Sequence, residues 1–279
     1  MSVSERQFAA FAAKQEGQIP FDTSPRHLVG PGDARHVTHG LAAAGWSPTS
    51  DALSPEIVLQ SRDRRIAVHL DPQSPTSAWW RVWAENTDNE AGWYAEFGEL
   101  VPAEILSRFT DALIAPPPAQ GADPFEALVT AGWVLDSATA ARSADGMCHV
   151  TQRHDPVDAQ TSSWHIEVCT PGHGTPMGPR IWHAWFARNT PEHLVHTFID
   201  ALADLAPLQR GMYDRTSHHS VVQRPSPLTP AQVVAAHVTR LNTIRKQASA
   251  TRQRQRGAPA TAAAAKASTA PPGARRSSR

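Results

Sequence analysis

The chain has 279 residues, of which 41% are hydrophobic, and this suffices for one large or two small globular domains. No apolar run reaches the roughly 18 residues that a membrane span needs, and charged residues between Glu5 and Glu16 interrupt the N-terminus where a signal peptide would be apolar. Two cysteines make no disulfide framework, so we expect a reduced, cytoplasmic protein.

The charges are balanced overall but not along the chain. The 26 Lys and Arg equal the 26 Asp and Glu, yet no acid follows Asp214. An acidic body with a basic end predicts that this end contacts an anionic partner, folds onto the body, or keeps the chain soluble. For nucleic acid as the partner, the candidate contacts are Arg240, Arg245, Lys246, Arg252, Arg254 and Arg256.

Residues 1–33 are predicted to form an N-terminal helix followed by a connector. The helix runs from Ser4 to Lys14, and it needs to dock on the rest of the protein because so short a helix is marginal alone. Residues 21–33 contain several prolines and glycines, which argue against regular structure there.

A first repeat covers residues 34–116. Its opening helix ends at Gly45, since glycine is the preferred residue just beyond a helix C-terminus. Four strands follow, and three of them alternate apolar and polar residues as half-buried strands do. An amphipathic helix from Pro102 closes the repeat. The predicted strands are residues 57–59, 65–70, 79–85 and 93–97.

A second repeat covers residues 125–207, after a Pro- and Ala-rich linker at residues 117–124. Both repeats have the same residues at the same offsets around their last strand and helix. In the second repeat, Thr190 is expected to cap the helix that begins at Pro191. The shared stretch is Trp93, Ala95, Phe97, Pro102, Phe109 and Asp111-Ala112-Leu113 in repeat 1, and Trp182, Ala184, Phe186, Pro191, Phe198 and Asp200-Ala201-Leu202 in repeat 2.

Each repeat therefore reads as a helix, a four-stranded antiparallel sheet and a second helix. The predicted fold class is α+β, with two tandem repeats packed as a pseudo-symmetric pair. Residues 208–227 are expected to be a second connector. Residues 228–249 form an amphipathic helix that starts with a capping box from Thr229 to Gln232. Residues 250–279 lack apolar bulk and are predicted to be a disordered basic tail.

The repeated pattern resembles a known domain family. Each repeat combines Ala-Gly-Trp near its start, a strand with a central Trp, and Phe-x-x-x-x-Pro before a final Ala-Leu helix. With the lead-in from Ser24 to Thr38, this pattern resembles the SPDY domain across residues 24–207, with the family's short signature near residues 61–64 and 143–146. The resemblance implies an actinobacterial, Streptomyces-type protein that carries the domain twice. It implies no activity, because the family is one of unknown function.

Alternation along the strands assigns their side chains to two faces. The Trp and Phe positions that the repeats share form one face, which the helices must cover. The opposite face is too aromatic for a plain solvated surface. Three interpretations are open. The opposite faces of the two repeats cover each other, or these faces pack on the terminal helices. Alternatively, they form a groove for a protein partner, because Trp, Tyr and Arg are enriched at contact surfaces. The candidate contact residues are Trp79, Arg81, Trp83, Tyr94, Glu96, His165, His183 and Trp185.

The sequence carries no catalytic, cofactor-binding or metal-binding motif. Histidine pairs such as His36 and His39 lack Cys or carboxylate partners at metal-ligand spacing. Cys148 falls in the core register, whereas Cys169 falls on the opposite face, where solvent can reach a thiol. We therefore predict a non-enzymatic module that binds an unidentified protein partner without a cofactor. The alternative is an accessory or regulatory protein that holds nucleic acid through its basic end.

Overall fold

The computed structural model describes residues 3–51, 53–76, 78–88, 90–115, 123–155, 161–172 and 177–257. Within them the chain combines helices with antiparallel sheets, which confirms the predicted α+β class. Most of the predicted linker at residues 117–124, and the part of the predicted tail beyond residue 257, lie outside the described residues. Among the described helices, none is long and apolar enough to cross a membrane.

Within the described residues, each repeat contains five strands between two helices. Repeat 1 consists of α2 (Arg35–Ala44), β2 (Ser47–Pro48), β3 (Ile57–Gln60), β4 (Ile66–Leu70), β5 (Ala78–Ala84), β6 (Trp93–Gly98) and α3 (Ala103–Ala112). Repeat 2 consists of α4 (Pro124–Thr130), β7 (Val134–Ser137), β8 (Ala140–Arg142), β9 (Cys148–His154), β10 (Ser162–Cys169), β11 (Arg180–Phe186) and α5 (Glu192–Ala203).

The predicted number of four strands per repeat is therefore one too few. The additional strand, β2 or β7, comes directly after the opening helix and its glycine. Gly45 and Gly132 adopt left-handed φ angles of 94° and 85°, which turn the chain from the helix toward the strand, and Gly45 ends α2 as predicted. All residues of β2 and β7 are exposed, so no apolar alternation reveals these strands in the sequence.

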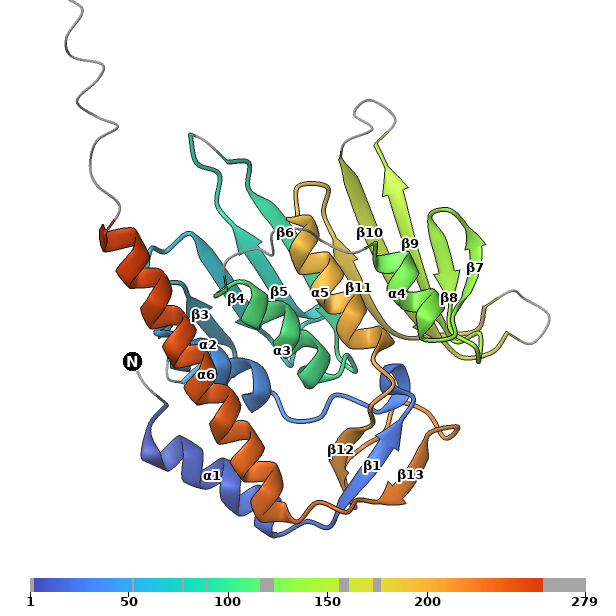
Figure 1. Cartoon of the computed structure of the whole chain (residues 1–279), viewed down its shortest axis with the longest axis horizontal. Coiled ribbons are helices and arrows are strands. Elements are labelled where there is room, and N and C mark those ends of the chain that lie inside the picture. Colours follow the sequence, from blue (N-terminus) through green and yellow to red (C-terminus); the bar gives the residue numbers. More distant parts are fainter. Residues whose placement is uncertain are drawn as a thin grey trace, which may run out of the picture.

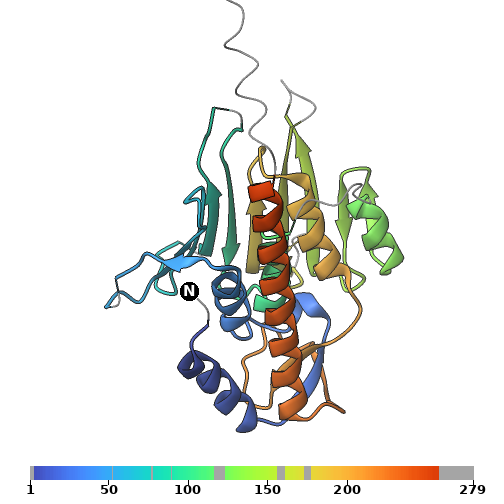
Figure 2. The ribbon, with the colours of Figure 1, turned by 60° about the vertical axis from the view of Figure 1, so that its left-hand side comes forward.

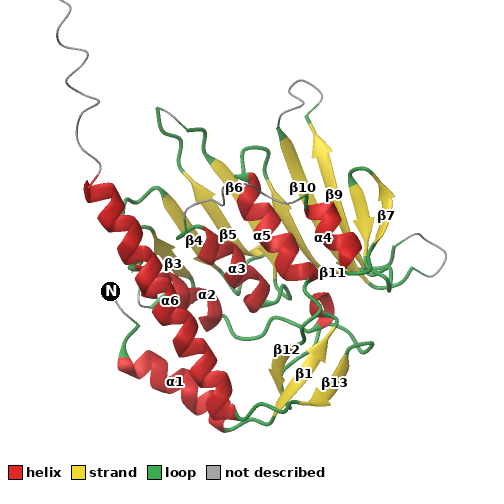
Figure 3. Cartoon of the chain, in the orientation of Figure 1, coloured by secondary structure: helices red, strands yellow, loops and turns green. Residues whose placement is uncertain are grey.

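The two repeats share a single ten-stranded sheet in the order β2-β3-β4-β5-β6-β11-β10-β9-β8-β7. They join where β6 pairs with β11, with Phe97 opposite Ala184 and Glu96 opposite Trp185. The helices α2, α3, α5 and α4 cover one face of this sheet (Figures 1 and 3). The expectation that each repeat has its own sheet is therefore wrong. The interpretation that the two repeats cover each other face to face is wrong as well, because their strands lie side by side in one sheet. In an isolated repeat β6 or β11 would be an unpaired edge, and their pairing satisfies both backbones.

The core lies between the sheet and these four helices. At its centre the rings of Phe97 and Phe186, from the two joining strands, lie 5.4 Å apart between centroids. Both rings also contact Phe109 of α3 and Phe198 of α5, and all four are fully buried. The positions that the repeats share therefore build the joint between them, which confirms their assignment to the helix-covered face.

The start of α5 differs from the prediction. Pro191, and not Thr190, occupies the N-cap position, and no side chain caps the helix. The Thr190 hydroxyl instead donates to the carbonyl oxygen of Tyr94 at 3.1 Å. This hydroxyl thus ties repeat 2 to β6 of repeat 1, a long-range contact that local capping rules do not anticipate.

A second, three-stranded sheet consists of β1 (Pro20–Ser24), β12 (Leu208–Gly211) and β13 (Val222–Pro225), with β1 in the middle. A 3-10 turn, η1 (Arg26–Leu28), follows β1. The prediction that residues 21–33 lack regular structure is therefore wrong, and the predicted connector at residues 208–227 contains two strands. Pro20 begins β1 and Pro225 ends β13, and these are positions where a strand tolerates proline.

Two helices complete the molecule, α1 (Glu5–Glu16) and α6 (Pro230–Gly257). Capping boxes at Ser4 and Thr229 start them, the second as predicted. α6 packs on α1 and α2 (Figure 2). It ends at residue 257 instead of the predicted 249, so residues 250–257 are helical rather than disordered. Their Ala, Arg and Gln are good helix formers, and Arg252 donates to the Ala44 carbonyl oxygen at 3.3 Å.

Candidate functional site

The second face of the ten-stranded sheet carries the candidate contact residues, and among the described elements no helix or strand lies on it (Figures 1 and 2). Strand register lines up one residue from each of five neighbouring strands. His69 of β4 lies opposite Arg81 of β5, and Arg81 lies opposite Glu96 of β6. Across the joint, Glu96 lies opposite Trp185 of β11, which lies opposite His165 of β10. We call these five residues the face row, and both repeats contribute to it.

The centre of the face row is a hydrogen-bonded group around Glu96. The Tyr94 hydroxyl donates to Glu96 Oε2 at 3.0 Å, and His183 Nε2 lies 3.3 Å from Glu96 Oε1. The Tyr94 ring also packs against Trp185 at 5.8 Å between centroids. Glu96 thus connects a tyrosine of its own repeat with a histidine of the other, and these contacts order the face before any partner binds.

Burial sets the protonation of this group. Burial, and after it the hydrogen bond to Glu96, raises the pKa of Tyr94 to about 12, so the hydroxyl remains a donor at neutral pH. Burial lowers the pKa of His183 and of His165, so both imidazoles are neutral at pH 7. This group therefore presents aromatic rings, neutral imidazoles and a carboxylate to a partner. None of its side chains is an activated nucleophile.

The aromatic side chains of this face differ in how well a partner can reach them. Trp185 is 36% exposed, while Trp83 and Tyr94 are half-buried. Trp79 fits the prediction less well, because it lies at a bulge beside Trp80 and packs partly against the core. Trp185 of repeat 2 is therefore the most accessible aromatic anchor of this face, and Trp83 of repeat 1 is partly accessible on the other side of the joint.

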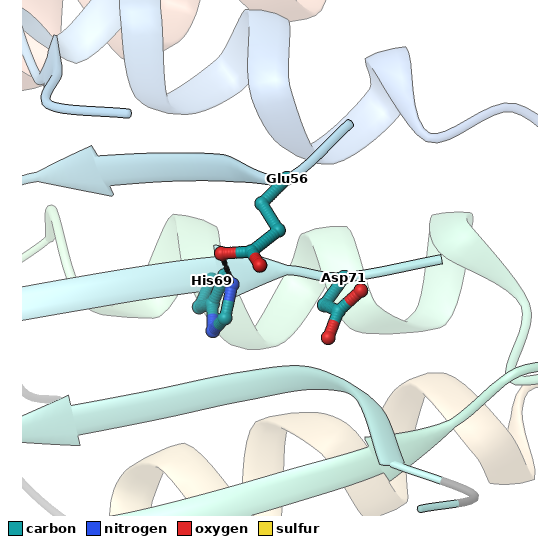
Figure 4. A group of neighbouring side chains, drawn as sticks. All are labelled: Glu56, His69 and Asp71. Carbon is teal, nitrogen blue, oxygen red and sulfur yellow. Dashed lines mark hydrogen bonds and ion pairs between the residues drawn. The ribbon is translucent and has the colours of Figure 1, made fainter. Parts of the chain in front are cut away.

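A possible metal-ligand group lies on the β3–β4 hairpin, where the sequence analysis found none. Glu56, His69 and Asp71 bring three potential ligand atoms within 4.8 Å of one another (Figure 4). His69 Nε2, however, forms a 3.0 Å hydrogen bond with Glu56 Oε2, and Glu56 is exposed. His69 and Glu56 are already hydrogen-bonded to each other, and exposed acidic groups are common without an ion, so we assign this group no metal.

Both cysteines are buried. Cys148 is fully buried, as its core register predicted, and burial raises its pKa well above the ordinary value. The prediction that solvent reaches Cys169 is wrong, because this residue is 5% exposed and burial raises its pKa as well. The register of β10 shifts between Val168 and Cys169, which takes Cys169 out of the alternation on which the prediction depended.

The helices α1 and α6 and the three-stranded sheet, which we call the terminal layer, line a half-open cavity of about 260 Å³. Arg210, 2% exposed, donates to both carboxylate oxygens of Glu104 at 2.6 and 3.0 Å, and to the carbonyl oxygens of Val29 and Gly30. Burial raises the pKa of Glu104, but Arg210 together with His36 and a backbone hydrogen bond holds that pKa below its usual value. This buried ion pair fastens β12 to α3 and forms one wall of the cavity.

Three imidazoles connect α6 to α2 beside this cavity. His39 Nδ1 lies 3.2 Å from His237 Nε2, and the His237 ring stacks on Phe11 of α1 at 4.2 Å between centroids. The His36 ring meets His237 edge-on at 5.2 Å. Burial lowers the pKa of His39 to about 4 and that of His237 to about 3. The neutral histidines therefore serve to pack α1, α2 and α6 together.

Acidification is expected to weaken this packing. The folded pKa values of His39 and His237 lie below the ordinary 6.5, so the unfolded chain binds more protons between pH 6.5 and about 3. The stabilisation of the fold by the neutral His39 and His237 is complete above pH 6.5 and declines as the pH falls through this window. Urea unfolding at about pH 7 and pH 4.5 measures the loss, which His237→Phe should reduce because phenylalanine keeps the ring contact without titrating. The exposed His154→Phe is the control, and an unchanged pH dependence in His237→Phe would contradict the assignment.

The basic residues of α6 fall into two groups. Arg240 is used internally, since its guanidinium donates to both oxygens of Asp111 at 2.8 and 2.6 Å and to the His36 carbonyl oxygen. Other candidate nucleic-acid residues remain without an ion pair among the described residues, namely Arg245, Lys246, Arg252 and Arg254. Arg256 belongs to α6, but its side chain is not among those that the structure describes. The helical part of the basic end is thus docked on the body while it keeps most of its charges available.

One ten-stranded sheet passes through both repeats of the chain. The SPDY family model, described as a domain of unknown function (DUF317), matches it in two segments, residues 60–119 and 142–208. This match agrees with the resemblance to the SPDY domain, and its two segments are consistent with two tandem copies. Each matched segment starts beside the predicted signature and contains the last three strands and the closing helix of its repeat. No curated protein and no solved structure matches the chain.

Proposed function

We propose that this protein is a non-enzymatic module that binds a protein partner on the uncovered face of its ten-stranded sheet. The observation that carries the proposal is the face row, which passes without interruption from repeat 1 into repeat 2. Trp, Tyr and Arg are the residue types enriched at contact surfaces. The contacts of Glu96 with Tyr94 and His183 hold this face in order, which reduces the entropy lost on binding.

The double variant Trp83→Ser/Trp185→Ser tests this proposal. Removal of an aromatic anchor from the centre of an interface typically costs about 2 kcal/mol or more, so capture of the partner should fall by at least about 30-fold. The measurement is a pull-down from native extract, followed by titration of the partner it identifies. Tyr213→Ser is the matched control, because Tyr213 is 84% exposed and lies outside the sheet. A partner that the double variant binds as tightly as the native chain would rule out this face.

The second candidate function is association with nucleic acid through the basic end. The specific observation that favours it is the set of α6 cations that no described acid neutralises, in contrast to Arg240. Lysine and arginine side chains of this kind bind backbone phosphates with an affinity that falls steeply as salt rises. Titration of labelled DNA and RNA at several salt concentrations tests this function independently of the sheet face.

A further inference from the structure

Four arginines from two distant segments surround one open hollow of about 700 Å³. Arg62 and Arg64 come from the turn between β3 and β4, and Arg245 and Arg252 come from α6. We call this site the arginine hollow. No carboxylate lines it, and within the described part of the chain none of the four guanidinium groups forms an ion pair. The remaining lining residues are small, namely Ala43, Gly45, Ser47, Ser61 and Ser249.

The α6 side of the hollow is held in place by hydrogen bonds to neutral groups. Arg252 donates to the Ala44 carbonyl oxygen at 3.3 Å and to the Ser249 hydroxyl at 2.8 Å. Arg245 donates to Asn242 Oδ1 at 3.0 Å. These bonds orient the two guanidinium groups without neutralising their charges.

The other repeat has the same turn without the arginines. In both turns a serine hydroxyl bonds the aspartate two residues later, and the fourth residue has a left-handed φ, 61° for Arg64 and 70° for Gly146. Arg62 corresponds to Ala144. A left-handed φ costs a residue with a Cβ about 1–2 kcal/mol, and glycine avoids this cost. Repeat 1 therefore keeps an arginine at a position where its backbone favours glycine, and this arginine faces the hollow.

We propose that the arginine hollow binds the backbone phosphates of a nucleic acid. The proposal rests on the second candidate function and assigns it a binding site. Two of the four arginines of this site belong to repeat 1 and lie outside the basic end. The planar guanidinium fork matches a phosphate group, and an anion removes the mutual repulsion of four like charges that lack acidic partners. An open hollow also lets a continuous sugar-phosphate backbone pass across it.

The test compares variants of the full-length chain by fluorescence anisotropy with labelled duplex and single-stranded DNA at several salt concentrations. Arg62→Ala/Arg64→Gly gives the turn of repeat 1 the residues found at the same positions in repeat 2. The fold should therefore be retained, and glycine removes the conformational cost of the left-handed φ at position 64. This variant should bind more weakly, and the slope of log affinity against log salt should become shallower by about 2, one for each lost phosphate contact. Arg245→Ala/Arg252→Ala should have the same effect from the α6 side.

Arg254→Ala is the matched control, because Arg254 is an exposed arginine of the same helix that does not line the hollow. Its slope should equal that of the native chain. If the native chain binds neither form of DNA, nor RNA in the titration described above, the second candidate function fails and the proposal with it. If the native chain binds DNA but Arg62→Ala/Arg64→Gly binds it equally well, the assignment of the arginine hollow as the binding site is overturned while the second candidate function stands. Binding of pyrophosphate without any binding of DNA would overturn the assignment to a nucleic-acid backbone.

Discussion

Replacement of Arg210 by methionine should lower the free energy of unfolding by about 3–5 kcal/mol, because it leaves the carboxylate of Glu104 inside the protein without its partner. Arg210 makes two hydrogen bonds to Glu104 and two to main-chain carbonyl oxygens between η1 and α2. Its loss therefore breaks contacts to two segments that are far apart in the sequence. Urea unfolding followed by circular dichroism measures the change.

The control for Arg210 is an ion pair at the surface. Arg215 lies 3.0 Å from Glu99, but its own side chain is 67% exposed and that of Glu99 is 39% exposed, so Arg215→Met should change stability by about 1 kcal/mol or less. The double variant Arg210→Met/Glu104→Leu should recover much of the stability lost in Arg210→Met, since it removes the unpaired charge as well. If Arg210→Met and Arg215→Met are equally stable, the buried pair does not have the role that its geometry indicates.

Truncation of Phe97 to alanine should destabilise the protein by about 3–5 kcal/mol, because the cavity opens where the two repeats meet. Phe97 is fully buried and contacts three other phenylalanine rings, from α3, β11 and α5. Urea unfolding followed by both circular dichroism and tryptophan fluorescence measures the loss. The native chain should unfold in one transition, since sheet and core are continuous across the joint.

Phe186 provides the test of whether the joint acts as a unit. It is the equivalent residue of repeat 2 and touches Phe97 directly, so the effects of Phe97→Ala and Phe186→Ala should not add. Leu53→Ala, at a residue that is 94% exposed, should leave stability unchanged. Strictly additive effects of the two phenylalanine variants would show that the repeats are stabilised independently.

The internal repeat made the core predictable. Because Trp93, Phe97 and their counterparts recur at the same offsets, their face could be separated from the face of Tyr94 and Trp185, and the structure has both faces as expected. Alternation gives the side of a sheet on which a residue lies, but it does not tell which strand is the neighbour. The pairing of β6 with β11 was therefore missed, and with it the row that crosses both repeats.

The terminal layer was the least predictable part of the chain. β1 and β13 are short, proline-bounded strands, and all residues of β13 are exposed, so neither shows the pattern of a half-buried strand. The arginine hollow was missed for a different reason. Arg62 and Arg64 lie in a turn of repeat 1, and only the docking of α6 on α2 brings Arg245 and Arg252 beside them.

The central place of β1 in the three-stranded sheet has a consequence for the order in which the protein folds. Asp22 of β1 bonds Gln209 of β12, 187 residues later in the chain, and β13 follows β12. During synthesis β1 therefore emerges long before either of its partners, whereas the strands of each SPDY repeat follow one another closely. Closing so long a loop loses more chain entropy than pairing adjacent strands does, so this sheet forms after the repeats. A strand that precedes both repeats in the chain is thus expected to pair only after them.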